Sequence, residues 1–165
     1  MLTIKNVMPE TKNLEEIRCL YEKSFPKNER RPFMELLTVP QSSAETVALN
    51  DGELFCGFAV FLNGKEISHI IYFAIEEKLR NRGYGSSALQ ALHTYKKGRR
   101  IMVDIESEKP EAPNNEQRHK RKQFYLRNGY TQTSIRYHWR QEDYEILTYG
   151  GNVTEEEYED FWKQL

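Results

Sequence analysis

Residues 70–92 read IIYFAIEEKLRNRGYGSSALQAL, and this stretch decides the fold. An apolar run is followed by a short charged segment and then by Gly83 and Gly85, after which apolar residues recur at helical spacing up to Tyr95. That order predicts a strand, a tight loop and a helix. The first N–H groups of a helix have no intrahelical partner, and glycine lets a ligand come close to the backbone. The stretch therefore predicts a loop that binds an anion, with a phosphate ester as the natural guest.

The glycine spacing narrows the choice of nucleotide ligand. Glycine is absent from the four positions before Gly83. Neither the phosphate-binding loop of the nucleoside triphosphatases nor the three-glycine dinucleotide fingerprint is satisfied. ATP and NAD are thus not favoured.

The chain before this stretch predicts helices followed by a meander. Asn13 and Glu16 have the spacing of a capping box, and the pattern after them predicts a helix over Leu14–Ser24. A short second helix is expected over Pro32–Leu37. Three antiparallel strands are expected from Thr46 to Ile75, separated by the turn dipeptides Asp51-Gly52 and Asn63-Gly64.

In the chain after this stretch, segments with the apolar spacing of a strand alternate with segments that have the spacing of a helix. We expect, in order, a strand over Arg100–Ile105, a polar, basic helix over Glu116–Asn128, strands over Tyr130–Trp139 and Tyr144–Tyr149, and a last short helix opened by a Thr154/Glu157 capping box. Strand–helix units of this kind lay their apolar stripes on a sheet. The predicted fold class is α/β or α+β, with a mixed sheet covered by helices.

Composition excludes several classes of function. The chain has 165 residues, which suits one domain over 1–165. Its 24 Lys and Arg balance 25 Asp and Glu, so no drive toward nucleic acid or anionic membranes is expected, and the apolar runs are too short to cross a bilayer. Cys19 and Cys56 are too few for a disulfide framework or a thiolate metal site. We expect a cytoplasmic protein with no metal.

Two motifs carry a family resemblance. Arg80-Asn81-Arg82-Gly83-Tyr84-Gly85 resembles the acetyl-CoA signature of the GNAT superfamily of N-acetyltransferases, Arg/Gln-x-x-Gly-x-Gly/Ala after a strand. About forty residues on, Phe124-Tyr125-Leu126-Arg127-Asn128-Gly129-Tyr130 is similar to the family's Phe-Tyr-x-x-x-Gly-Phe/Tyr ending of its second conserved helix. The resemblance covers roughly Thr46 to Gln132. It implies a mostly antiparallel sheet with a central, splayed parallel strand pair.

The resemblance implies an N-acetyltransferase that moves the acetyl group of its cosubstrate acetyl-CoA to a primary amine by direct attack in a ternary complex. The pyrophosphate of acetyl-CoA would be held by the loop residues Asn81, Arg82, Gly83, Tyr84, Gly85 and Ser86. The pantetheine arm would pair with the backbone of Phe73, Ala74 and Ile75. As acceptor we favour a small-molecule amine over a protein amine, and a homodimer is left open.

Three residues are candidates for proton transfer. By resemblance, Tyr125 is the donor to the departing thiolate, and a phenol with a pKa near ~10 suits a thiol near ~8.5. His69 falls where histone-acetylating relatives carry their glutamate base, and a histidine suits that task. Glu106 competes with it as base or as ammonium ligand, because it follows a strand at its carboxyl end. Asp104 is expected on the other face and is the weaker candidate.

Arg118 departs from the family, which often has asparagine seven residues before the helix tyrosine. With Lys120, Arg121 and Lys122 it forms a basic run that is either a solvated helix face or a clamp for CoA phosphates.

Two rival functions also stay open. One is a non-catalytic acyl-CoA sensor or interaction domain, and the other is an anion-binding module that does not bind CoA.

Overall fold

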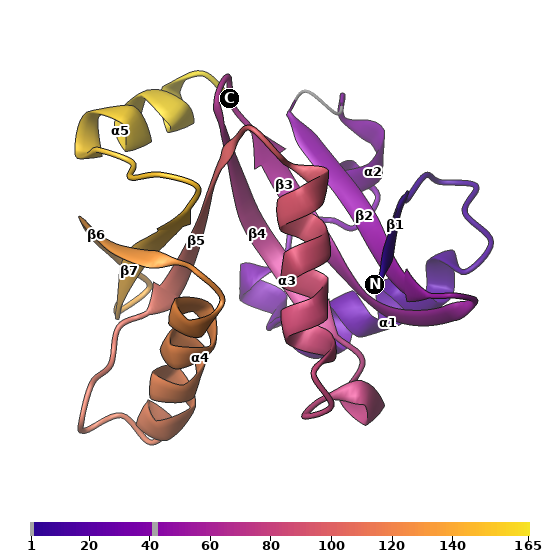
Figure 1. Ribbon diagram of the computed structural model, residues 1–165, viewed down its shortest axis with the longest axis horizontal. Helices are drawn as coiled ribbons and strands as arrows, with labels where there is room; N and C mark the ends of the chain where they lie inside the picture. The colour runs from indigo at the N-terminus through magenta and orange to yellow at the C-terminus, as the bar shows by residue number, and fades with distance from the viewer. Residues whose placement is uncertain (1, 41–42) are drawn as a thin grey trace. The chain divides into compact units, whose positions relative to one another are not determined.

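A computed structural model describes residues 2–40 and 43–165 (Figure 1). The strands are β1 (Thr3–Asn6), β2 (Ala44–Asp51), β3 (Leu54–Asn63), β4 (Ile67–Ile75), β5 (Arg100–Glu106), β6 (Thr131–Trp139) and β7 (Glu142–Tyr149). The helices are α1 (Leu14–Ser24), α2 (Glu35–Thr38), α3 (Tyr84–Tyr95), α4 (Asn115–Arg127) and α5 (Glu155–Lys163). Two single 3-10 turns, η1 (Lys27–Glu29) and η2 (Glu77–Leu79), complete the order.

The sheet has the strand order β1-β2-β3-β4-β5-β7-β6. β1 with β2, β2 with β3, β5 with β7 and β6 with β7 are antiparallel. β4 and β5 are the parallel pair, joined by the crossover helix α3, and at their start the N–H of Arg100 donates to the carbonyl of Glu66 at 3.2 Å. The predicted mixed, mostly antiparallel sheet with a central parallel pair is confirmed.

The chain divides into two compact units. Unit 1 is the chain before Gly64 together with Ile70–Lys97, and unit 2 is Gly64–His69 together with Gly98–Leu165. β4 is the only strand of the described residues that runs from one unit into the other, because its first three residues belong to unit 2. A single domain over the whole chain stays a prediction.

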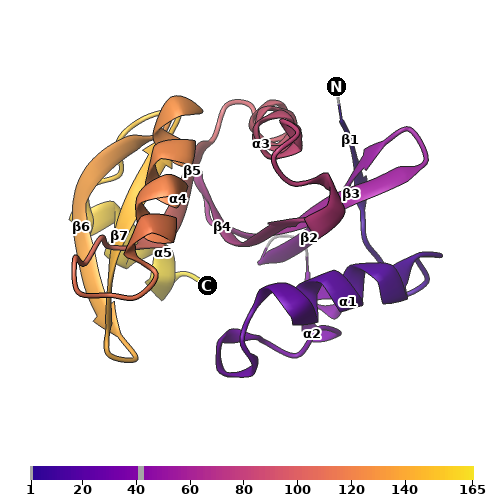
Figure 2. The ribbon, with the colours of Figure 1, turned by 90° about the horizontal axis from the view of Figure 1, so that it is seen from below.

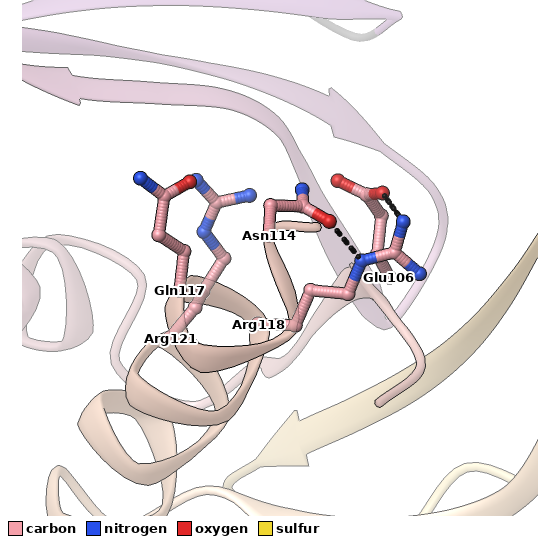
Figure 3. Close-up of a pocket in the computed structure, with 5 residues that line it drawn as sticks. All are labelled: Glu106, Asn114, Gln117, Arg118 and Arg121. Atoms are coloured by element: carbon pink, nitrogen blue, oxygen red, sulfur yellow. Dashed lines mark hydrogen bonds and ion pairs between the residues drawn. The ribbon is translucent and has the colours of Figure 1, made fainter. Parts of the chain in front are cut away.

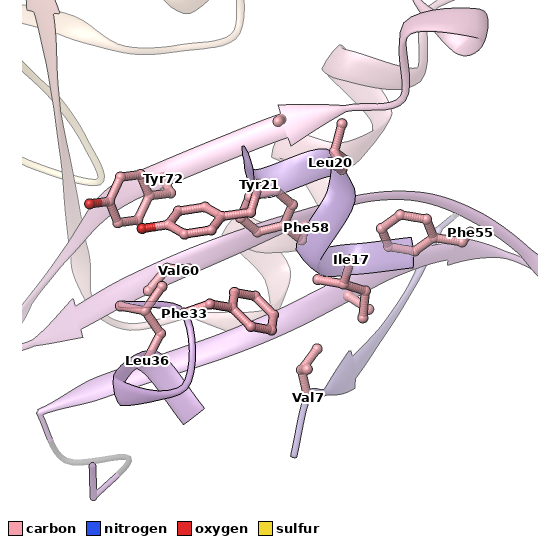
Figure 4. Close-up of a cluster of buried hydrophobic side chains, with 12 residues drawn as sticks. Val7, Ile17, Leu20, Tyr21, Phe33, Leu36, Phe55, Phe58, Val60 and Tyr72 are labelled. Carbon is pink, nitrogen blue, oxygen red and sulfur yellow. The ribbon is translucent and has the colours of Figure 1, made fainter. Parts of the chain in front are cut away.

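Unit 1 is a sheet with helices on both faces. α1 and α2 lie on one face and α3 on the other (Figure 2). Between the sheet and α1 lies a cluster of buried side chains in which Tyr21 packs edge-on against Phe58 and Tyr72, with ring centroids 5.9 and 5.0 Å apart (Figure 4). The Tyr72 hydroxyl donates to the carbonyl of Glu29 at 2.7 Å and accepts from the N–H of Arg31 at 3.1 Å. The cluster thereby holds the segment after α1 against β4.

Unit 2 is built on the antiparallel strands β5, β7 and β6. The register sets Asp104 opposite Ile146, and α4 packs on β5. α5 begins at the predicted capping box: the Glu157 N–H donates to the Thr154 hydroxyl at 3.1 Å, and the Thr154 N–H donates to the Glu157 carboxylate at 3.0 Å. These bonds fix the start of α5, whose Phe161 is buried.

Two local predictions differ from the structure, and one strand was not predicted. Asn13 makes no side-chain cap bond, because its backbone is not extended and its amide instead donates to Glu16 at 3.4 Å. The capping box predicted there is wrong. The second helix is a single turn that begins at Glu35 rather than at Pro32. β1 was not predicted, because its four residues alternate little and it is defined by pairing with β2.

Candidate functional site

The loop between β4 and α3 lies in unit 1 and is shaped by two left-handed residues. Asn81 has φ 62° and Gly83 has φ 83°. Before them, the Arg80 side chain donates to the carbonyl of Ile75 at 3.0 Å, and Leu79 is buried. The loop is thus tied to the end of β4 and turns sharply into the first residue of α3.

Gly83 caps α3 and faces open space. A Cβ built on this glycine would meet nothing within 4 Å, so the room beside it is free for a ligand. Its carbonyl accepts the first intrahelical bond, from Ser87 at 3.1 Å, while the first N–H groups of any helix point outward with partial positive charge. The structure therefore has the local features of an anion site at the predicted loop.

Tyr84 ties this loop to the turn between β2 and β3. Its hydroxyl donates to the Asp51 carboxylate at 2.9 Å. This hydrogen bond raises the pKa of Tyr84. A phenol held by an aspartate fixes the start of α3 from a second side, which limits the conformations open to the loop.

The three predicted pantetheine residues end β4. Phe73 is partly buried, and Ala74 and Ile75 are buried. On the neighbouring strand, a Cβ built on Gly57 would lie 2.3 Å from the carbonyl oxygen of Ala74. Only glycine allows β3 to approach β4 this closely. Sequence reasoning did not select Gly57, although an isolated glycine inside a strand is a signal of close backbone approach.

Tyr125 lies near the end of α4 in unit 2. Its ring packs edge-on against Phe124 and Tyr130, with centroids 5.3 and 5.1 Å apart, and the residue is 9% exposed. Burial raises the pKa of Tyr125 to about 12, and the negative charge of Asp104 acts in the same direction. Tyr125 is therefore a protonated phenol at any physiological pH.

His69 is buried in unit 2 beneath α5. Its Nε2 lies 3.2 Å from Asp104 Oδ1, and its ring packs against Phe161 and Trp162, with centroids 6.0 and 5.4 Å away. The residue is 1% exposed. Nδ1 is buried and has no hydrogen-bond partner among the residues that the structure describes. The contact with a carboxylate orients the ring and leaves Nδ1 as the unused nitrogen.

Asp104 joins His69 to Tyr137. One carboxylate oxygen faces His69, and the other accepts a hydrogen bond from the Tyr137 hydroxyl. Burial alone would raise the pKa of Asp104, but His69 and the Tyr137 hydrogen bond outweigh it and hold the pKa below its usual range. The expectation that Asp104 points to the other face is wrong. Residues two apart on a strand share a face, so Asp104 lies on the same side of β5 as Glu106.

Glu106 is bound to Arg118. The two side chains form an ion pair of 2.9 Å, and Arg118 also contacts the Asn114 amide oxygen at 2.9 Å (Figure 3). A second carboxylate, that of Glu142, lies 3.1 Å from Arg118. Arg118 is 6% exposed. It is therefore neither part of a solvated helix face nor free to clamp a phosphate, and it neutralises Glu106. A small polar pocket is lined by Glu106, Asn114, Gln117, Arg118 and Arg121.

The described residues contain no group of three or more His, Cys, Asp or Glu arranged to hold a metal ion. Within the same part of the chain, no helix is both long and apolar enough to cross a membrane.

Residues 42–132 match the family model of the acetyltransferase (GNAT) domain, which is more than half of the chain. The chain belongs to the GNAT acetyltransferase family. The matched range contains the Gly83 loop of this GNAT chain, its helix α3 and Tyr125. The resemblance that the two motifs carried is thereby confirmed at the level of the family.

Solved structures agree on the fold. A protein assigned to the GNAT acetyltransferases from Bacteroides thetaiotaomicron is similar, with a TM-score of 0.81 and 24% identity over 99% of this chain and 95% of that one. The ribosomal-protein-S18-alanine N-acetyltransferase of Escherichia coli has a TM-score of 0.62 and 16% identity, and the match covers 93% of this chain and 99% of that one. A GNAT acetyltransferase from Elizabethkingia anophelis with acetyl-CoA bound has a TM-score of 0.59 and 16% identity, and the match covers 90% of this chain and 97% of that one. No curated protein matches this sequence.

Proposed function

We propose that this chain is an acetyl-CoA-dependent N-acetyltransferase whose acceptor is the primary amine of a small molecule. The observation that carries the proposal is the loop at Gly83, where a left-handed glycine opens α3 onto free space in a chain of the GNAT family. A helix start of this form binds phosphate esters. Acetyl-CoA carries such phosphates and supplies an activated acetyl thioester.

The residues of unit 1 fit acetyl-CoA, the donor of the acetyl group. In this proposal the segment from Asn81 to Ser86 holds the pyrophosphate through backbone N–H groups, so its side chains need not be specific. The end of β4, from Phe73 to Ile75, pairs its backbone with the amides of the pantetheine arm. The Tyr84 hydroxyl supports the pyrophosphate site indirectly, because its bond to Asp51 holds the helix start in place.

Tyr125 returns a proton to the departing thiolate. A thiolate is a good leaving group, but it can attack the acetyl group again. Protonation to the thiol makes this reverse reaction slower. The pKa of about 12 keeps the Tyr125 hydroxyl protonated, as a donor must be. It also lies further above that of a thiol, near ~8.5, than the pKa of an ordinary tyrosine does, so Tyr125 gives up its proton less readily than an ordinary tyrosine. Its packing against Phe124 and Tyr130 also fixes the ring and hence the position of the hydroxyl oxygen.

His69 and Glu106 are the two candidates for the base that frees the acceptor amine of its proton. His69 has Nδ1 available to accept a proton, directly or through a water, but it is deeply buried. Glu106 is more accessible, with 28% of its side chain exposed, but its carboxylate already forms an ion pair with Arg118. The pH profiles of the His69→Ala and Glu106→Gln variants distinguish the two candidates.

The test is release of CoA thiol from acetyl-CoA in the presence of a panel of primary amines: alkylamines, diamines, amino sugars and a peptide with an N-terminal alanine. We expect turnover with at least one small amine and a rise in melting temperature with CoA. Binding of CoA without turnover on any amine would support the acyl-CoA sensor instead. No heat of binding and no melting shift with CoA would refute both.

A further inference from the structure

Asp104 combines a fixed carboxylate with access to solvent. Its side chain is 28% exposed, whereas that of His69, its neighbour in the same cluster, is 2% exposed. Both carboxylate oxygens are engaged, one with His69 and one with the Tyr137 hydroxyl. Within the cluster of His69, Asp104 and Tyr137, Asp104 is thus the charged group that a molecule arriving from solvent can reach.

No lysine or arginine among the described residues forms an ion pair with Asp104. Other carboxylates of unit 2 have such partners: Glu106 and Glu142 pair with Arg118, and Glu145 pairs with Lys122 at 3.0 Å. Charges in a partly buried environment are normally paired. Asp104 instead contacts a histidine, which is charged only when protonated, and a phenol, so its carboxylate is suited to an external cation.

His69 contacts the carboxylate through one ring nitrogen, Nε2, at 3.2 Å. Its other nitrogen, Nδ1, is buried and has no hydrogen-bond partner among the described residues. The contact is made to one carboxylate oxygen, so it orients Asp104 and leaves lone pairs on both oxygens for a ligand.

We propose that Asp104 binds the ammonium group of the acetyl acceptor, with His69 and Tyr137 as positioning residues. This inference rests on the proposed function and identifies its acceptor as an amine that arrives in the cationic form. The two neighbouring donors hold the carboxylate in one orientation while each oxygen keeps a lone pair for the ligand. The pKa of Tyr125 responds to the Asp104 charge, so the ammonium would lie within the field of the proposed proton donor.

The main test compares Asp104→Asn with a matched control, Asp143→Asn. Asp143 is also an aspartate bonded to a histidine, His138 at 2.8 Å, but it lies exposed on β7. With the fastest amine of the panel, Asp104→Asn should raise the acceptor KM about 10-fold or more, the usual scale for losing a hydrogen bond to a charged group, and leave acetyl-CoA affinity unchanged. Asp143→Asn should change neither. An unchanged acceptor KM in a folded Asp104→Asn variant overturns the proposal.

Tyr137→Phe keeps the proposal testable if Asp104→Asn does not fold. It retains the carboxylate and the aromatic ring but removes one of the two donors, so the acceptor KM should rise a few-fold without loss of acetyl-CoA binding. A merely structural hydroxyl would lower stability and leave the KM unchanged, and that result would contradict the positioning role.

A binding measurement separates failure of this inference from failure of the proposed function. If the wild type acetylates no amine, the proposed function fails, and the Asp104 site is then tested by NMR titration with butylamine against 1-butanol. Preference for butylamine that disappears in Asp104→Asn supports an ammonium site. Equal binding of the two probes by the wild type, or an unchanged preference in the variant, overturns it.

Discussion

The Gly83 loop of unit 1 and the Asp104 cluster of unit 2 are built in different ways. The loop consists of consecutive residues whose backbone does the work, through a left-handed glycine and the N–H groups of a helix start. The cluster consists of side chains distant in the sequence, with His69 and Asp104 35 residues apart and Tyr137 another 33 residues on. A backbone site tolerates side-chain change and a side-chain site does not. We therefore expect substitutions in the two regions to fail in different ways.

The largest effect is expected at Gly83. Gly83→Val should abolish acetyl-CoA binding, because a branched side chain would occupy the free space beside the helix start and would strain a backbone at φ 83°. Calorimetry and the melting shift with acetyl-CoA measure this loss.

Gly98→Val is the matched control. Gly98 also has a positive φ, 88°, and free space around a built Cβ, but it follows the other end of α3. Both variants should lose similar stability, of the order of 1–2 kcal/mol for a left-handed non-glycine residue. Only Gly83→Val should lose the ligand. If both bind acetyl-CoA like the wild type, the Gly83 loop is not the donor site.

The next effect is expected at Tyr125. Tyr125→Phe should lower kcat by about 10²-fold while acetyl-CoA affinity stays the same, because the ring keeps its packing and only the proton donor is lost. Tyr130→Phe, a change to the buried tyrosine 5.1 Å away, is the comparison and should lower kcat far less. Equal losses in the two variants would make Tyr125 a packing residue.

His69 and Glu106 should differ in their pH profiles. A base works only when unprotonated, so kcat/KM should rise with pH as the base loses its proton. If His69 is the base, His69→Ala removes this rise and Glu106→Gln keeps it. The reverse result assigns the base to Glu106, whereas a loss confined to the acceptor KM makes Glu106 a substrate anchor. A rise present in both variants excludes both residues as the base.

The smallest effect is expected at alkaline pH, where kcat should stay unchanged. Because the pKa of Tyr125 is raised to about 12, the phenol stays protonated well above the ordinary value. The rate should therefore not fall between roughly pH 8 and pH 10 through loss of this proton, although an ordinary tyrosine would begin to ionise there. Stopped assays of kcat at each pH measure this. An alkaline fall in that range that Tyr125→Phe removes would show that the hydroxyl is less buried than described.

Most elements were predictable because their signals are local. The capping box of Thr154 and Glu157 forms as its spacing predicts, and the turn at Asp51-Gly52 joins β2 to β3. Asn13 and Glu16 have equally good spacing, yet the box does not form, because the chain enters α1 with a different backbone angle. A capping motif thus predicts a helix start better than it predicts the bonds.

The sequence by itself determined the loop at Gly83 and the family, because a glycine at a helix start and the motif around it act over a few consecutive residues. Only the tertiary structure decided the partners of the charged groups. Arg118 is buried against Glu106, and Asp104 lies against His69 and Tyr137. Strand order and register bring these residues together, and neither can be deduced from alternation along one strand. The physical reason is that the groups around a charged side chain decide what it can bind, and here those groups lie on other strands and helices.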